Sequence, residues 1–186
     1  MKRSFDIFIA VILLIILLIP LLFLSAVIKF TSKGSFLYWS KRVGKGNIIF
    51  FMPKFRTMTQ DAPEVATHLL QNPSSYYTSV GKFLRRYSID EFPQLYSIIK
   101  GDMSLVGPRP ALYNQEGLIN LRIQAGVHNL VPGLTGLAQI SGRDELPIKE
   151  KVKIDSNYLE RKSFIFDLYI IWLTLLKVIR KEGISH

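Results

Sequence analysis

The chain has 186 residues, a formal net charge of +10 from 24 lysines and arginines against 14 aspartates and glutamates, and no cysteine. This length accommodates one ordinary domain together with an anchoring segment, and the absence of cysteine excludes a disulfide framework and thiolate metal sites. The positive balance favours anionic partners, namely nucleic acid, acidic lipid head groups or phosphorylated substrates.

An apolar segment comes first in the chain. Residues 7–28 carry no charge over 22 positions and lie between Lys2-Arg3 and Lys29. A straight helix of that length rises about 33 Å, which is enough to cross a hydrocarbon core of roughly 30 Å. The apolar region of a signal peptide is shorter, at about 7–15 residues. The sequence therefore predicts a membrane-embedded helix.

Pro20 leaves two topologies open for this helix. It divides the apolar segment into 13 residues before it and 8 after it, and a proline inside a helix removes a hydrogen bond and kinks the axis. A re-entrant helix that dips into the bilayer and returns would keep both basic flanks in one compartment. Proline-kinked helices also span membranes, and the positive-inside rule permits a spanning anchor with Lys2-Arg3 outside. The residues alone do not decide between these alternatives.

A basic block follows the apolar segment. Residues 29–60 contain seven lysines and arginines and no acidic residue, and such sequence beside a membrane is attracted to anionic lipid by about 1 kcal/mol per charge. Within the block, strand-like residues at 35–40 and 48–52 on either side of a turn at 44–47 predict a β-hairpin over 36–55. A solvated positive flank beside the membrane would explain the first basic residues of the block. It explains Lys54 and Arg56 less well, because they lie among apolar neighbours.

Most of the remaining chain is predicted to be helical. The predicted helices cover residues 58–68, 80–86, 88–101, 115–126, 150–161 and 163–179. Ser88 is the expected cap of the third helix and Gly101 its end. The prolines and glycines of 105–110 and 131–143 predict ordered loops, the second with some strand character. The segment 150–161 is amphipathic, whereas 163–179 is apolar nearly all round and is expected to be buried or to lie in lipid.

Two adjacent carboxylates, Asp90 and Glu91, fall at the start of the helix predicted over 88–101. Acidic residues in a first turn complement the helix dipole, which is the ordinary structural explanation for such a pair. The pair also suits phosphoryl transfer, in which one carboxylate attacks phosphorus and the other holds a divalent cation.

Basic residues around the pair favour the chemical explanation. Arg109 and Arg143 lie in loops constrained by proline and glycine, where a guanidinium is well placed to bind phosphate through two donors. Three further cations directly precede the carboxylates and could neutralise phosphate: Lys82, Arg85 and Arg86.

The whole arrangement resembles the bacterial sugar transferase family, the small monotopic phosphoglycosyl transferases that begin glycan assembly on a polyprenol phosphate. The matching stretches keep the order of the family and extend over nearly all of the chain. They are KRSFD at 2–6, KFRTM at 54–58, IDEFPQL at 89–95, GDMSLVGPRP at 101–110, PGLTGLAQ at 132–139 and GR at 142–143.

The resemblance implies a reaction. A UDP-sugar gives its sugar-1-phosphate to undecaprenyl phosphate and releases UMP, as the first membrane step in the assembly of a capsule, O-antigen, exopolysaccharide or glycoprotein glycan. By carry-over, Asp90 is the nucleophile that forms a covalent phosphosugar-aspartyl intermediate, and Glu91 is a ligand of Mg²⁺. The residues expected to contact phosphate are Lys54, Arg56, Arg109 and Arg143.

The resemblance also implies an architecture. We expect an α+β, mostly helical fold with an N-terminal re-entrant membrane helix over 1–33, a small β-hairpin and interfacial amphipathic helices. The catalytic domain, 34–186, is expected on the cytoplasmic face of the bacterial inner membrane, as a monomer or a homodimer. In one departure from well-studied relatives, Ile19 replaces a serine before Pro20 and cannot bond a freed backbone group. We therefore expect Asp6, or another polar group near the head groups, to help hold the bend.

Two other functions are open from the sequence. A membrane-anchored nucleic-acid-binding protein would suit the net charge and the aromatic residues among the basic ones, and would bind in a salt-dependent manner. It would leave the two carboxylates without a role, and no nucleic-acid partner is expected. A scaffold protein without catalysis is the third alternative. The residues do not indicate which sugar is transferred.

Overall fold

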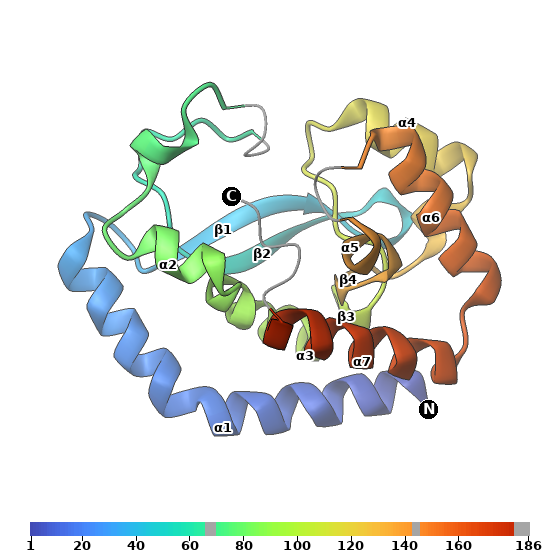
Figure 1. Ribbon diagram of the computed structural model, residues 1–186, viewed down its shortest axis with the longest axis horizontal. Helices are drawn as coiled ribbons and strands as arrows, with labels where there is room; N and C mark the ends of the chain where they lie inside the picture. The colour runs from blue at the N-terminus through green and yellow to red at the C-terminus, as the bar shows by residue number, and fades with distance from the viewer. Residues whose placement is uncertain (66–69, 143–145, 181–186) are drawn as a thin grey trace.

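The structure is a computed structural model, described here for residues 1–65, 70–142 and 146–180. Helices predominate, with two small two-stranded sheets among them (Figure 1). The α-helices are α1 (Lys2–Thr31), α2 (Gly81–Arg86), α3 (Leu95–Lys100), α4 (Glu116–Gln124), α5 (Leu137–Ser141), α6 (Ile148–Arg161) and α7 (Phe164–Arg180). The strands are β1 (Leu37–Val43), β2 (Ile49–Phe55), β3 (Ser104–Val106) and β4 (Gly133–Thr135), and the 3₁₀ turns are η1 (Lys45–Asn47), η3 (Pro73–Tyr76), η4 (Ile89–Gln94) and η5 (Val127–Asn129).

The predicted apolar helix is α1, which has Pro20 in its interior. Figure 1 shows it running beneath α3 and α7 and then bending, and an internal proline is a usual cause of such a kink. Among the described residues it is the one helix long and apolar enough to cross a membrane, and only 6% of its most apolar window is buried. Such exposure excludes the core helix of a soluble protein and suits a helix embedded in lipid.

The first turns of α1 are attached to the rest of the chain by polar contacts. Lys2 forms an ion pair with Asp167 of α7. Arg3 donates hydrogen bonds to the carbonyl oxygens of Ile98 and Ile99, at 2.6 and 2.9 Å. The carboxylate of Asp6 is buried and accepts a hydrogen bond of 2.7 Å from the hydroxyl of Ser104, the first residue of β3.

The last turns of α1 pack against the same domain. Ile28 is fully buried and forms an apolar cluster with Phe55 of β2 and Leu84 of α2. Both ends of α1 therefore contact one folded body. This arrangement is compatible with the predicted re-entrant topology, because a straight spanning helix would separate its ends by the thickness of the bilayer.

The predicted hairpin is confirmed. β1 and β2 pair antiparallel in a register that sets Leu37 opposite Phe55 and Val43 opposite Ile49. The connection contains Gly46 and Asn47 in the left-handed conformation, with φ of 65° and 62°, which glycine and asparagine adopt most readily. This hairpin carries Lys54 on its second strand.

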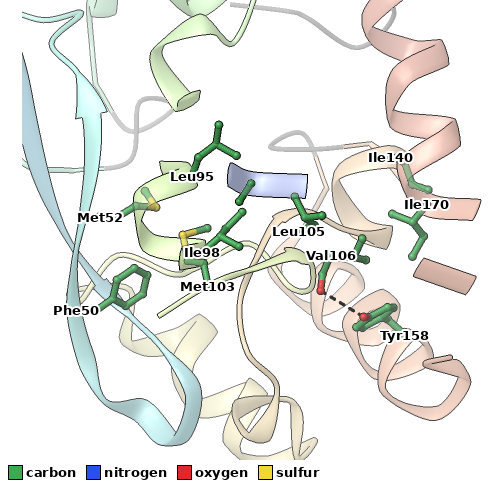
Figure 2. Packing of buried hydrophobic residues seen from close by; sticks show 11 residues of the cluster. Phe50, Met52, Leu95, Ile98, Met103, Leu105, Val106, Ile140, Tyr158 and Ile170 are labelled. Carbon is green, nitrogen blue, oxygen red and sulfur yellow. Dashed lines mark hydrogen bonds between the residues drawn. The ribbon is translucent and has the colours of Figure 1, made fainter. Parts of the chain in front are cut away.

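A second sheet joins two loops that the sequence analysis described separately. β3 pairs in parallel with β4, with Ser104 opposite Gly133 and Val106 opposite Thr135. The main core lies beside this pair, where side chains from β2, α3, α5, α6 and α7 meet (Figure 2). Its labelled members include Met52, Leu95, Ile98 and Ile170.

Most predicted helices are present, with three corrections. No helix forms in the described part of 58–68, where Met58 instead makes an antiparallel bridge with Tyr77; residues 66–69 lie outside the described residues. Ser88 has a left-handed backbone with φ of 54° and makes no side-chain cap bond, and the segment after it begins as a 3₁₀ turn. The loop predicted over 131–143 contains the short helix α5 as well as β4.

Candidate active site

The carboxylate pair lies on η4, directly after the left-handed turn at Ser88. A non-glycine residue with positive φ is uncommon and costs on the order of 1–3 kcal/mol, and such residues cluster at functional sites. Here the turn redirects the chain from α2 into η4. Asp90 is buried, with 6% of its surface exposed. A buried carboxylate must be compensated by cations or hydrogen bonds.

Glu91 is held by two cations from different parts of the chain. Its Oε1 atom lies 2.7 Å from Nη2 of Arg109 and 3.0 Å from Nζ of Lys54. The second nitrogen of the Arg109 fork is 3.5 Å from Oε2. The structure therefore brings together three of the predicted site residues, which are separated by up to 55 positions in the sequence.

The electrostatics of the two carboxylates differ. Burial raises the pKa of Asp90 above its ordinary value, and the opposing charge of Lys54 does not cancel that effect. Burial acts in the same direction on Glu91, but Arg109 and Lys54 outweigh it and hold the pKa of Glu91 well below its usual range. Burial also lowers the pKa of Lys54, while Glu91 opposes the shift. Neighbouring carboxylates whose pKa values are driven apart are typical of acids with separate chemical roles.

Arg109 stands on a loop whose backbone is held by two other arginines. Nη1 of Arg122 donates a 2.8 Å hydrogen bond to the carbonyl oxygen of Arg109. Nη1 of Arg42 donates a 3.0 Å bond to the carbonyl oxygen of Pro110. The fixed φ of the flanking prolines and these two bonds restrict the loop at consecutive residues, so the Arg109 side chain leaves from a constrained backbone.

Arg122 is itself fixed by a buried carboxylate. Its Nε and Nη2 atoms donate to Oδ2 of Asp155 at 3.0 and 2.7 Å, and both side chains are almost fully buried. A buried pair of this kind rigidifies its surroundings when each donor has a partner. Neither Arg42 nor Arg122 was predicted as a site residue, because composition does not distinguish a buried arginine from a surface arginine.

Two further residues lie near the carboxylates: Arg85, which was already predicted as a cation that could neutralise phosphate, and Gln94, which the sequence did not single out. Arg85 of α2 lies close enough to Asp90 to oppose the rise in its pKa, and its guanidinium lies over the ring of Tyr77. Gln94, at the end of η4, is buried, and its Nε2 atom has no hydrogen-bond partner among the described residues. A buried amide donor without a partner is a candidate contact for a ligand oxygen.

The other two predicted phosphate ligands are Arg56 and Arg143, and only Arg56 is among the described residues. Arg56 follows β2 directly, and its Nε atom donates a 2.7 Å hydrogen bond to the carbonyl oxygen of Ser35, at the entry to β1. Arg143 lies outside the described residues. Their predicted roles therefore stay predictions.

The donors at the pair fit a magnesium ion that arrives with a phosphate ligand. Mg²⁺ binds oxygen, and it commonly takes one or two carboxylates and completes its shell with phosphate and water. Asp90 and Glu91 supply adjacent carboxylates, and the described residues contain no larger cluster of metal-binding side chains. Oε2 of Glu91 makes only the longer of the two Arg109 contacts, so it is less engaged by cations than Oε1, which also accepts from Lys54.

Comparison with known proteins gives a consistent result over the whole chain. Residues 1–181 match the family model described as "Bacterial sugar transferase". The chain is 39% identical to the uncharacterized sugar transferase EpsL of Bacillus subtilis, over all of this chain and 91% of that protein. It is 36% identical to the exopolysaccharide production protein ExoY of Sinorhizobium fredii, over 98% of this chain and 87% of that protein. The undecaprenyl-phosphate glucose phosphotransferase of Komagataeibacter xylinus is 39% identical over 96% of this chain, but the match covers only 36% of that protein.

Proposed function

The chain belongs to the bacterial sugar transferase family and is a phosphoglycosyl transferase, and on this premise we propose that it transfers sugar-1-phosphate from a UDP-sugar to undecaprenyl phosphate and releases UMP. The observation that supports this most directly is the placement of Asp90 and Glu91. They lie on a constrained turn, with Glu91 bound by Lys54 and Arg109. Phosphate chemistry requires such a gathering of cations around a nucleophile.

The first step is attack by Asp90. A carboxylate oxygen of Asp90 forms a bond to the β-phosphorus of the UDP-sugar, and the bond from that phosphorus to the bridging oxygen breaks. UMP leaves with the bridging oxygen, and the sugar phosphate stays on Asp90 as an acyl phosphate. The buried position of Asp90 supports this role, because a carboxylate with few water contacts and a raised pKa is a stronger nucleophile once ionised.

The second step returns Asp90 to its original state. An oxygen of the lipid phosphate forms a bond to the same phosphorus, and the Asp90 carboxylate leaves. The product is a polyprenyl diphosphate sugar. Arg109 is suited to binding phosphate in both steps, because about a third of its side chain is exposed and the planar fork of a guanidinium matches the geometry of phosphate oxygens.

Magnesium is the proposed metal, with Glu91 as its main protein ligand and Asp90 beside it. When bound, the ion would neutralise charge on the diphosphate and on the departing UMP. Lys54 keeps the Glu91 carboxylate ionised and in place. The low pKa of Glu91, which Arg109 and Lys54 cause, suits this assignment, since a protonated carboxyl would be a poor ligand.

The proposed location is the cytoplasmic face of the bacterial inner membrane. The exposed apolar surface of α1 and membership of the family indicate association with a membrane. The re-entrant topology would place both ends of α1 and the catalytic domain in one compartment. We propose that residues 1–33 serve as this anchor and residues 34–186 as the catalytic domain.

Purified Asp90→Asn protein tests the nucleophile. We expect the rate of UMP release from a UDP-sugar to fall by roughly a thousandfold or more, with no sugar phosphate retained on the denatured protein. Asp102→Asn, which changes an aspartate beyond the end of α3, is the matched control and should keep both signals. UMP release by Asp90→Asn at the wild-type rate would overturn the assignment. A panel of UDP-sugars, assayed with undecaprenyl phosphate, would then identify the donor.

A further inference from the structure

A pocket outside the candidate active site lies beside the first turn of α1. It has a volume of about 340 Å³, and it is bounded by the start of α1, by η1 and by the junction of α6 with α7. None of the residues assigned to the reaction above is among the described residues that line it. The proposed mechanism therefore does not use this pocket.

The wall of the pocket is positively charged. Its described ionisable side chains, apart from a tyrosine, are three lysines and one aspartate: Lys2, Lys45, Lys162 and Asp167. Asp167 is already neutralised inside the wall, because Lys2 pairs with one carboxylate oxygen and the hydroxyl of Tyr158 donates a 2.6 Å hydrogen bond to the other. Lys45 and Lys162 are exposed. Their charges are thus directed at solvent or at a ligand, and an anion is the chemistry they favour.

The rim of the pocket reaches the surface expected to face lipid. Phe164, the first residue of α7, lines it and packs edge to face on Phe5 of α1 with the ring centroids 5.2 Å apart. Large apolar side chains of α7, beginning with Ile165 and continuing to Trp172, are exposed beyond this point. Exposed apolar residues beside lysines are the arrangement by which helices lie in the head-group region.

We propose that this pocket binds the phosphate head group of an anionic phospholipid of the surrounding bilayer. The lysines would contact the phosphate, and the acyl chains would continue over Phe164 and the exposed side of α7. The phosphate of a polyprenol acceptor is a poorer candidate, because it must reach the phosphosugar on Asp90. The site would orient the catalytic domain on the membrane through a contact separate from α1.

The test compares the binding of an anionic and a zwitterionic phospholipid to the full chain in detergent micelles. Unfolding temperatures are measured in neutral micelles and with increasing mole fractions of phosphatidylglycerol or phosphatidylcholine, because a ligand of the folded state raises the unfolding temperature. We expect a rise with phosphatidylglycerol alone. In Lys45→Gln/Lys162→Gln, the apparent affinity for phosphatidylglycerol should fall by about 25-fold, about fivefold for each lysine.

The matched control is Lys149→Gln/Lys153→Gln, which removes the same charge from two exposed positions of α6 outside the pocket. It should bind phosphatidylglycerol within about twofold of the wild type, whereas an equal loss in both double variants would indicate only general attraction and overturn the proposal. If soluble glycerol phosphate raised the unfolding temperature as much as phosphatidylglycerol does, the pocket would be a site for free anions. That result would also overturn the proposal. A selective rise in the KM for undecaprenyl phosphate in Lys45→Gln/Lys162→Gln would assign the pocket to the acceptor instead.

Discussion

Nη1 of Arg122 lies 2.8 Å from the carbonyl oxygen of Arg109, so that one buried guanidinium fixes the backbone from which another guanidinium reaches the carboxylate pair. The Nε and Nη2 atoms of Arg122 both donate hydrogen bonds to Asp155. A planar group with several donors in fixed directions is needed to make these contacts at once. Arg122 is therefore expected to position Arg109 without touching substrate.

The first prediction concerns Arg122→Lys. A lysine keeps the charge, but its single nitrogen cannot bind both Asp155 and the Arg109 carbonyl from the guanidinium positions. We expect kcat/KM for the UDP-sugar to fall by about 10- to 100-fold, since small displacements of a positioning group have effects of this size. Steady-state UMP release and thermal unfolding of the same preparation measure the effect.

Two variants separate positioning from stability. Asp155→Asn keeps the donors of Arg122 but removes their counter-charge. It should lower the unfolding temperature, and it should lower kcat/KM by less than Arg122→Lys does. Arg161→Lys, an exposed arginine at the end of α6, should change neither. If Arg122→Lys had a lower unfolding temperature but a normal kcat/KM, its role would be structural only.

The sequence predicted the elements whose signals are local. The hairpin follows from two strand-like runs around a turn at 44–47, α6 follows from its amphipathic pattern, and α7 follows from a long apolar run. The parallel pair of β3 and β4 was not predicted, because each strand has three residues and the pairing joins Ser104 to Gly133. The helix predicted over 58–68 is wrong in its described part, 58–65, because Met58 pairs with Tyr77, a tertiary contact that local propensity does not reveal.

The same distinction applies to the candidate site. Lys54 and Arg109 were predicted as phosphate contacts and Glu91 as a metal ligand, from their neighbourhoods and from the resemblance to the family, and the structure places Glu91 in contact with both cations. Arg42 and Arg122 act through the Arg109 loop, and only their burial and their directed hydrogen bonds distinguish them. Such supporting residues depend on the packing of distant segments, which composition does not encode.

The second prediction concerns Gly107 and Gly133, where the loop that carries Arg109 approaches β4. A Cβ atom on Gly133 would overlap the backbone nitrogen of Gly107, and the two segments exchange hydrogen bonds at this point. Gly133→Ala must therefore separate the loop that carries Arg109 from β4. We expect a loss of about 2–4 kcal/mol of stability, which is large for one methyl group, with a reduced rate of UMP release. Denaturant unfolding measures the first effect.

Gly117→Ala is the matched control for that experiment. Gly117 is the second residue of α4, and a Cβ there would meet nothing within 4 Å. Alanine should stabilise this helix by about 0.5–1 kcal/mol. Equal destabilisation by the two substitutions would contradict the close-approach argument.

The third prediction concerns the pH dependence of the reaction. Burial raises the pKa of Asp90 above its ordinary value of 3.8, so the nucleophile loses its charge at a higher pH than an exposed aspartate would. The acid limb of kcat/KM for the UDP-sugar, which reports the free enzyme, should therefore have its midpoint above pH 3.8. A midpoint at or below that value would show that the cations around Asp90 outweigh its burial.

The fourth prediction concerns the pH dependence of stability at Glu91. Its pKa is lower in the folded protein than its ordinary value of 4.5, so the unfolded chain binds the proton more readily. The ion pairs are consequently stabilising above about pH 4.5 and lose their contribution as the pH falls through the folded-state pKa. At pH 7, Glu91→Gln should be less stable than the wild type by about 1–3 kcal/mol, because Lys54 and Arg109 lose a charged partner. This difference should shrink steadily when unfolding is measured from pH 5 to pH 3, and a constant difference would contradict the assignment.

The fifth prediction concerns the topology of α1. Lys2 pairs with Asp167 at one end of the helix, while Ile28 packs against Phe55 at the other. If both contacts persist in the membrane, residue 4 and the catalytic domain share a compartment. The chain has no cysteine, so a single introduced thiol reports its own position. Ser4→Cys is preferable to a change at Lys2, because Ser4 is exposed and the ion pair is retained.

A membrane-impermeant maleimide added to intact cells distinguishes the two topologies. Ser4→Cys should be labelled only after the cells are permeabilised, in parallel with Ser74→Cys, an exposed serine of the catalytic domain that serves as the matched control. Labelling of Ser4→Cys in intact cells, with Ser74→Cys protected, would reject the re-entrant helix and require α1 to span the bilayer. That result would also mean that the Lys2–Asp167 pair and the Asp6–Ser104 hydrogen bond break in the membrane. Breaking them would leave buried polar groups without partners at a cost of about 1–3 kcal/mol each, and this cost is the physical reason to expect protection.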